Sequence, residues 1–175
     1  MEIKQPAAHL DQMIRQTRAH HVNLSTMADQ KANMMLTIAS LMIPLSTRFL
    51  YDQRSHLAAA TLIGFCVLTI LLAAYAAMPK LKRNKITDVP VDSLDPSYNL
   101  LFFGTFTRMD YKSYTENMEL MMNDPNRVYE TQVREIYTMG QYLARKKYRF
   151  LQFAYLAFIV GVLSSSIIYV TGSYL

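Results

Sequence analysis

The sequence predicts an all-α membrane protein with three transmembrane helices and cytosolic helical extensions continuous with the first and third spans. Two apolar runs, 57–78 and 150–170, contain no Asp, Glu, Lys, Arg or His and exceed the roughly 20 residues that cross the hydrocarbon core of a bilayer. A third run, 32–50, is also mostly apolar. With 51% hydrophobic residues and 5 glycines in 175 residues, one compact unit is expected rather than several domains.

Residues 1–31 are expected to form a cytosolic N-terminal helix that begins near Ala8. Apolar and small residues recur there with the three-and-four spacing of an amphipathic helix. Asp29 and Lys31 stand directly before the apolar run, and no helix breaker separates them from it. A removable signal peptide is not expected, because the first residues are polar and basic. The residues of the pattern are Leu10, Met13, Ile14, Thr17, His21, Leu24 and Ala28.

The first span is placed at 32–50, because Arg48 can reach the interface and a membrane helix tolerates Pro44. Residues 51–56 then form an external loop, and 57–78 form the second span. Lys and Arg are concentrated before the first span and between the second and third. The positive-inside rule therefore places the N-terminus in the cytosol and the C-terminus outside. The net charge of +5 is interpreted as basic residues that orient the chain in the membrane by contacting anionic head groups. Phosphate binding is the alternative role for some of the same residues.

Residues 79–149 are expected to form a cytosolic helical region. Its first part, 85–109, contains two prolines and the aromatic segment 100–106, and is predicted to be a loop with a short strand or a helical turn. Asp110 is a candidate N-cap of a short helix ending near Asn123, and Pro125 opens a long helix. The face predicted for that helix consists of Tyr129, Val133, Ile136, Gly140, Leu143 and Ala144.

The long helix is expected to continue into the third span, 150–170, which leaves 171–175 as an external tail. Helix from Pro125 to Val170 would form a rod of roughly 65–70 Å, half in water and half in lipid. Ala157, Gly161 and Ser165 recur every four residues on the span. Such small residues allow close helix packing, either within the chain or in a homo-oligomer.

Several functional classes have no support in the sequence. It contains no paired-cysteine metal spacing, HExxH motif, nucleophile elbow or Walker-type loop, so no metal, cofactor or enzymatic activity is expected. Adjacent His20 and His21 point in different directions on a helix. No ionisable residue lies deep in a span, which disfavours ion transport. A nucleic acid partner is not expected, and the lone Cys66 does not indicate a redox compartment.

Three segments, which occur in the same order along the chain, resemble segments of the Pycsar effector transmembrane family. HVNLSTMADQKANMMLTIASL resembles the family's entry to its first span, NLLFFG its Phe-Phe-Gly loop, and QYLARKKYRFLQFAYLAFIVGVL its entry to the last span. Together the segments extend from His20 to Val162. The matching residues are Asn23, Leu24, Ala28, Asp29, Lys31, Ala32, Phe102, Phe103, Gly104, Leu143, Lys147, Tyr148, Leu151, Ala154 and Tyr155.

The resemblance implies a bacterial antiphage effector in the inner membrane. In such systems a cyclase makes a cyclic pyrimidine mononucleotide, cCMP or cUMP, and the effector then impairs the membrane in abortive infection. The chain has no recognisable cyclic-nucleotide-binding jelly roll, so the membrane-proximal helices and loop would have to form the pocket. The lipid bilayer, the cyclase through its product, and further copies of the chain are the implied partners.

Ligand chemistry selects the candidate binding residues. A cyclic phosphate attracts Lys and Arg, and a pyrimidine offers a face for stacking and an edge for hydrogen bonds. Each group also has an alternative role. Lys147 and Arg149 can contact lipid head groups, and Asp29 can form an ion pair with Lys31 or with a neighbouring helix. Phe102 and Phe103 can insert into the bilayer or into the protein core. The candidates are Lys31, Arg134, Lys147 and Arg149 for phosphate; Phe103, Tyr111 and Tyr148 for stacking; and Asn23, Asp29 and Asn99 for the base edge.

Two other functional classes are compatible with the same helices. The chain can be a constitutive membrane scaffold that anchors a partner enzyme through its cytosolic helices, and an intramembrane enzyme is a third class. A cyclase gene beside this one favours the effector, whereas a neighbouring soluble enzyme without its own anchor favours the scaffold.

Overall fold

The computed structural model describes residue 3 and residues 7–79 and 99–172, all of which are helix, turn or irregular backbone without a strand. The chain divides into two compact units, where the composition had suggested one. Unit 1 comprises Met1–Asn23 and Pro79–Gln141, and unit 2 comprises Leu24–Met78 and Tyr142–Leu175. Helix α1, Ala8–Thr47, contributes its first part to unit 1 and its second part to unit 2.

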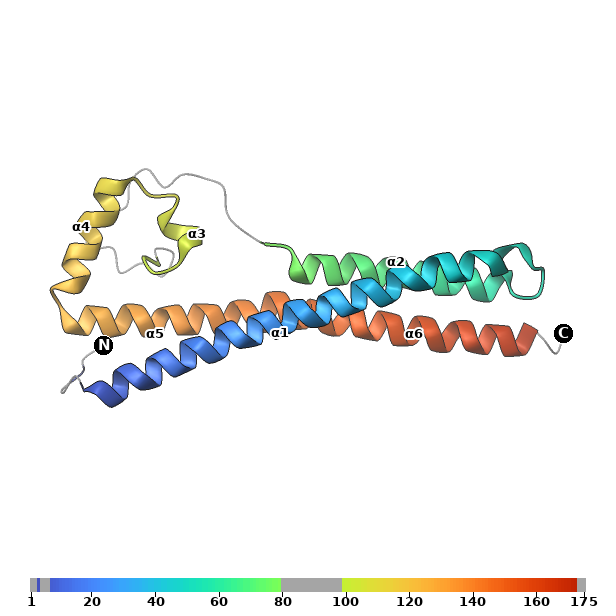
Figure 1. Cartoon of the computed structure of the whole chain (residues 1–175), viewed down its shortest axis with the longest axis horizontal. Coiled ribbons are helices and arrows are strands. Elements are labelled where there is room, and N and C mark those ends of the chain that lie inside the picture. Colours follow the sequence, from blue (N-terminus) through green and yellow to red (C-terminus); the bar gives the residue numbers. More distant parts are fainter. Residues whose placement is uncertain (1–2, 4–6, 80–98, 173–175) are drawn as a thin grey trace. The chain divides into compact units, whose positions relative to one another are not determined.

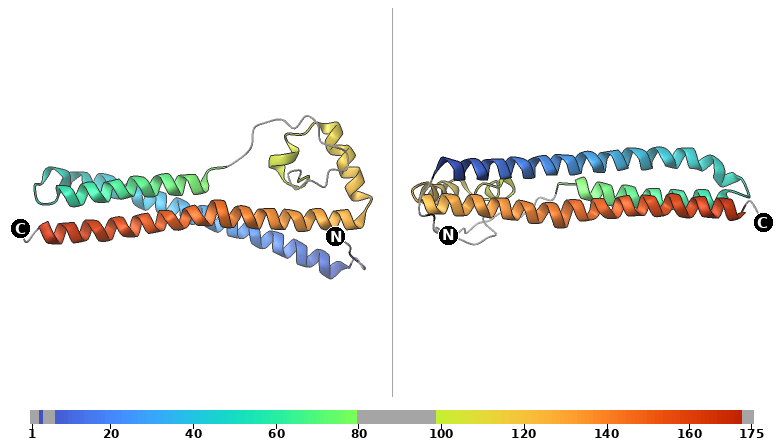
Figure 2. Two further views of the ribbon diagram at one scale, coloured as in Figure 1. Left: turned by 180° about the vertical axis from the view of Figure 1, so that it is seen from behind. Right: turned by 90° about the horizontal axis from the view of Figure 1, so that it is seen from below.

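Unit 2 consists of the apolar helices (Figure 1). The second part of α1 leads into a 3-10 turn, η1, at Arg48–Tyr51, and α2 follows at His56–Ala77. The last helix, α6, covers Arg149–Gly172. Helix α2 runs antiparallel beside α6 in every view (Figure 2). Three helical segments are long and apolar enough to cross a membrane: Ala8–Tyr51, His56–Ala77 and Pro125–Gly172. The expected all-α, three-span class is therefore confirmed.

Close packing joins α2 to α6. Gly161 faces α2 so closely that a Cβ on this residue would overlap the Cβ of Phe65. Four residues further along, the Ser165 hydroxyl donates to the Ala58 carbonyl at 2.8 Å. On α2, Cys66 and Thr69 are also buried. The small residues predicted to allow close helix approach therefore pack within the chain.

Helix α1 contacts α2 and α6 mainly through alanine. Ala28 and Ala32 form one buried cluster with Ala76 and Leu151. The next cluster combines Met35 with one residue from each of the other two helices, Ala73 and Ala154. Small side chains bring the backbones close, but they interlock less than the Gly161–Phe65 contact does.

Unit 1 contains the more polar helices. A helical turn, α3, covers Phe103–Phe106, within the segment predicted to be a strand or a turn. Asp110 caps α4, Tyr111–Met122, by accepting a hydrogen bond from the Ser113 N–H, and Asn123 ends this helix. Helix α5 covers Pro125–Tyr142. The predicted starts and ends of the two helices are confirmed, while most of the predicted loop before α3 lies outside the described residues.

The buried faces of the unit 1 helices agree with the predicted ones in part, since Ile14 and Tyr129 are buried as expected but other members of the two patterns are not. Met13 of the α1 pattern is 56% exposed, and Val133 of the α5 pattern is also exposed. Glu135, which is charged and was not in the pattern, is buried instead. The reason is that α1 and α5 contact each other through polar pairs, which an apolar period does not reveal.

A π-helix, η2, at Leu143–Tyr148 connects α5 to α6. The helical run is therefore continuous from Pro125 to Gly172, as the sequence predicts, but one of its turns is widened. Leu143, Lys147 and Leu151 are all buried at successive intervals of four residues. Such spacing drifts around a regular α-helix, and a π-turn corrects the drift.

The α2–α6 contact makes Gly161→Ala destabilising. We expect this variant to lose about 1–3 kcal/mol, because the new methyl group overlaps Phe65. Gly64→Ala is the matched control, since a Cβ there has no heavy atom within 4 Å. Thermal unfolding in detergent micelles, followed by circular dichroism, measures both. Equal unfolding temperatures for the two variants would contradict the packing described here.

Candidate functional site at the entry to the membrane helices

A buried lysine, Lys147, lies on the π-turn at the start of the part of the α5–α6 run that belongs to unit 2. The Lys147 ammonium donates to Asp29 Oδ1 at 2.7 Å, to Asp29 Oδ2 at 2.6 Å and to Ser25 Oγ at 2.8 Å. Lys147 is 7% exposed, and among the described residues Glu135 is the other buried charged residue. The ammonium has three N–H donors, and the acceptors on α1 engage them. We call Ser25, Asp29 and Lys147 the junction network.

Two features of the helices bring these groups together. On α1, Ser25 and Asp29 are one turn apart and so lie on the same face. On the other side, the π-turn keeps Lys147 directed toward α1 while Leu151 packs against Ala28 and Ala32. The site therefore depends on the register of the widened turn.

Tyr148 extends the junction network. Its hydroxyl donates to the Leu24 carbonyl at 3.1 Å, although this carbonyl lies within α1. Its ring packs beside the cluster of Ala28, Ala32, Ala76 and Leu151. Lys147 and Tyr148 thus bind neighbouring turns of the same helix.

Tyr142 reports the electrostatics of this region. Burial raises the pKa of its hydroxyl, and the negative charge of Asp29 raises it further. Both effects disfavour a phenolate here. Burial near the junction network therefore disfavours a charged side chain unless a group of opposite charge or a hydrogen-bond partner lies beside it.

Unit 1 has its own polar contacts between α1 and α5. The Tyr129 hydroxyl donates to Asp11 Oδ1 at 2.6 Å. This hydrogen bond is the main reason that the pKa of Tyr129 is raised, and burial is the second. Arg18 and Glu135 form an ion pair of 3.1 Å. Burial raises the pKa of Glu135, and the positive charge of Arg18 opposes this only in part.

His21 lies opposite Gly140 in unit 1. A Cβ on Gly140 would meet the His21 ring at 3.5 Å, which is an ordinary contact distance, so the two residues pack side by side without requiring glycine. Nδ1 of His21 is buried without a hydrogen-bond partner. In the described part of the chain, no three His, Cys, Asp or Glu residues gather as metal ligands would.

Of the candidates near the junction, the structure brings Asp29, Lys147 and Tyr148 together. Asp29 pairs with the neighbouring helix, which was one of the alternatives considered for it, and its partner is Lys147. Lys31 and Asn23 are exposed on α1. Arg149 is exposed and places its guanidinium 5.8 Å from the ring centroid of Phe153 on the same helix.

The remaining candidates belong to unit 1. Asn99 is buried, and its side chain accepts a hydrogen bond from the Leu101 N–H. Arg134 donates to Glu130 at 2.9 Å. Phe103 is exposed beside Phe102, with 5.1 Å between ring centroids.

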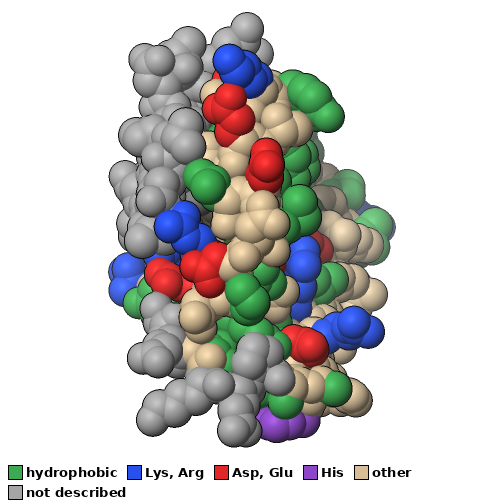
Figure 3. All heavy atoms as spheres, turned by 90° about the vertical axis from the view of Figure 1, so that its left-hand side faces the viewer, with side chains coloured by type: hydrophobic (Ala, Val, Ile, Leu, Met, Phe, Trp, Pro, Cys, Tyr) green, Lys and Arg blue, Asp and Glu red, His purple; other side chains and the backbone are tan. Residues whose placement is uncertain are grey.

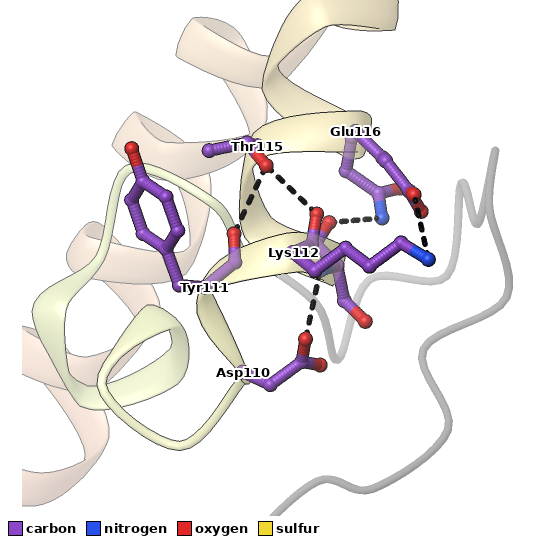
Figure 4. A network of polar contacts seen from close by, with 7 residues as sticks. Asp110, Tyr111, Lys112, Thr115 and Glu116 are labelled. Atoms are coloured by element: carbon purple, nitrogen blue, oxygen red, sulfur yellow. Dashed lines mark hydrogen bonds and ion pairs between the residues drawn. The ribbon is translucent and has the colours of Figure 1, made fainter.

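Tyr111 is the most exposed aromatic candidate, at 82%. Figure 4 shows its ring pointing away from Asp110, Lys112 and Glu116, whose polar contacts stabilise the first turns of α4. On the face shown in Figure 3, acidic and basic side chains are interspersed with hydrophobic ones. Phe103 and Tyr111 are thus accessible, whereas Tyr148 and Lys147 are engaged in contacts with α1.

Ser25 was missed by the sequence reasoning, although a signal for it existed. Buried or pairing positions on α1 recur every seven residues at 11, 18, 25, 32 and 39. A second series consists of the buried positions 14, 28 and 35 and the half-buried position 21. This heptad spacing is typical of a helix that packs along one continuous seam. The apolar pattern alone did not reveal it, because Asp11, Arg18 and Ser25 are polar.

Comparison with protein families finds a match to the Pycsar effector protein domain over residues 12–172. Comparisons with curated proteins and with solved structures gave no match. The family match covers α1 from residue 12 onward, α2 and the helical run that ends with α6. It includes every residue of the junction network.

Glu135 predicts a pH dependence of stability in unit 1. Its pKa is raised above the ordinary value of 4.5, so its stabilising contribution is present below that value and is lost as pH rises through the folded pKa. Glu135→Gln removes this loss. We expect the unfolding temperature of the variant, relative to the native chain, to be higher at about pH 7 than at about pH 4.

Asp110→Asn supplies a control of opposite sign. Hydrogen bonds from Ser113 lower the pKa of Asp110, so its contribution is present above its ordinary value and is lost as pH falls. Thermal unfolding of the Glu135 variant between about pH 4 and pH 7, and of Asp110→Asn from about pH 5 down to about pH 2, measures the two effects. If the unfolding temperatures of both variants changed in the same direction with pH, burial would not disfavour the charged form of Glu135.

Proposed function

Because the chain belongs to the Pycsar effector family, a family of antiphage defence effectors, we propose that it senses a cyclic pyrimidine mononucleotide and then impairs the bacterial inner membrane. The messenger is cCMP or cUMP, made by a cyclase with which the effector is functionally paired. Loss of membrane integrity stops the infected cell before phage matures. In this role the chain is a receptor and effector, not an enzyme.

The junction network is the observation that supports a signalling role most directly. Helix α1 and the helical run from α5 to α6 each connect soluble residues to an apolar span without a break. A charged contact between them lies where the spans begin. A ligand that alters this contact changes the relation between membrane helices without needing a separate transmitting domain.

The chemistry of the candidates fits a nucleotide. Exposed Lys31 and Arg149 can bind phosphate oxygens through charge-assisted hydrogen bonds. Exposed Phe103 and Tyr111 can stack on a base. We propose that the site draws on these groups, with Lys147 and Arg134 as further phosphate ligands, Tyr148 as a further stacking residue, and Asn23, Asp29 and Asn99 at the base edge.

Membrane impairment is proposed to require several copies of the chain. Three spans seldom enclose a pore, and the small-residue face of α6 is already covered by α2. A homo-oligomer would therefore use other faces of the spans. We place the N-terminus in the cytosol, where the cyclase product accumulates, and the C-terminus outside.

Dye leakage from liposomes tests the proposed function. Purified protein is inserted, its orientation is verified by protease protection, and cCMP, cUMP, cAMP and cGMP are titrated in parallel. We expect leakage with one of the two pyrimidine nucleotides. If no nucleotide causes leakage from vesicles with correct insertion, nucleotide sensing fails, and anchoring of a partner enzyme becomes the better account.

Lys31 gives a sharper test of the binding site. Lys31→Ala is expected to weaken nucleotide binding roughly ten- to hundredfold, the loss that corresponds to a hydrogen bond with a charged group. Folding should not change, because Lys31 is exposed. Isothermal titration in detergent measures the affinity, and Lys146→Ala, also exposed, is the matched control. Equal affinities in the two variants would remove Lys31 from the site.

A further inference from the structure

We propose that the junction network is an autoinhibitory contact: it holds α1 against the π-turn in the resting state, and its opening starts membrane impairment. The inference rests on the proposed function and adds the regulation of that function. It assigns Ser25 and Lys147 as the residues that keep the protein inactive, with Asp29 as the partner whose release permits the change.

The two sides of the ion pair differ in burial. The side chain of Lys147 is 9% exposed, whereas that of Asp29 is 41% exposed. A separated Asp29 can be hydrated where it stands, but a buried ammonium without an acceptor is strongly disfavoured. The contact is therefore favourable while α1 is in place, and opening it requires Lys147 to move toward water or to another acceptor.

The packing of unit 2 indicates which helix moves. Helices α2 and α6 interlock through the Gly161–Phe65 contact and the hydrogen bond from Ser165 to Ala58. Helix α1 contacts them through Ala28, Ala32, Met35 and Ala39, which are buried but mostly small. In lipid, apolar side chains gain little from contact with each other rather than with acyl chains. Polar contacts at the junction are thus a large part of what retains α1.

The π-turn makes the contact a two-state element. While Lys147 binds α1, the widened turn keeps both Lys147 and Leu151 on the face toward α1. Conversion of this turn to regular α-helix would rotate Lys147 relative to Leu151, so that the two contacts with α1 could no longer be made together. Single π-turns inside helices frequently lie at functional sites.

Lys147→Met tests the proposal directly. Methionine fills a similar volume without a charge, so no unpaired buried cation remains, and the freed Asp29 is partly exposed. We expect dye leakage without any nucleotide to increase roughly ten- to hundredfold over the native chain, as loss of hydrogen bonds to a charged group predicts. Lys146→Met is the matched control, because Lys146 is adjacent and exposed, and it should leave the vesicles tight.

A second variant and a second measurement separate release of α1 from misfolding. Asp29→Asn keeps a hydrogen-bond acceptor but removes the charge, and we expect leakage between that of the native chain and that of Lys147→Met. Spin labels at exposed positions 30 and 145, in a Cys66→Ser background, report the α1–π-turn distance. Lys147→Met should lengthen this distance while the circular dichroism spectrum remains helical.

The outcomes distinguish this proposal from the proposed function. Tight vesicles with Lys147→Met, or leakage without a change in the label distance, overturn the autoinhibitory contact. If the native chain still leaks with a pyrimidine nucleotide in that case, the proposed function stands. Leakage of Lys147→Met together with a native chain that no nucleotide activates supports the contact and rejects nucleotide sensing.

Discussion

The cost of burying one ammonium group governs the part of unit 2 in which α1 and the π-turn contact each other. Lys147 is almost entirely buried, and its position is compatible with folding only because Asp29 and Ser25 provide acceptors within 2.8 Å. Three neighbouring features are consistent with this need for acceptors. They are the π-turn that carries Lys147, the hydrogen bond from Tyr148 to the α1 backbone, and the packing of Leu151 against α1. A change at any of these points affects the others, because they share one short stretch of two helices.

The same seam of α1 changes in character along its length. In unit 1 its contacts are the pairs Asp11–Tyr129 and Arg18–Glu135. In unit 2 its contacts are alanines and a methionine. Polar pairs specify partners in water, where apolar contacts alone would allow several registers. Small residues allow close approach in lipid, where burial provides little driving force.

Much of the fold was predictable because its signals are local. The spans follow from length and the absence of charge, the start of α4 from the Asp110 cap, and the start of α5 from Pro125. The site was less predictable. Asp29, Lys147 and Tyr148 were identified by residue type and by resemblance to a family, yet their mutual contacts were not. Ser25 was missed because the first members of its seven-residue series, Asp11 and Arg18, are also polar, so an apolar pattern does not include them.

The sequence by itself determined the all-helical class, the three apolar helices, the helix caps and the family, since each depends on residues close together in the chain or on an ordered pattern along it. Only the tertiary structure decided that Lys147 is buried and paired, that Glu135 rather than Val133 faces α1, and that Gly161 packs against Phe65. These properties depend on partners far away in sequence. A side chain's charge is a property of the residue, but the energetic consequence of that charge depends on which acceptors the fold places beside it.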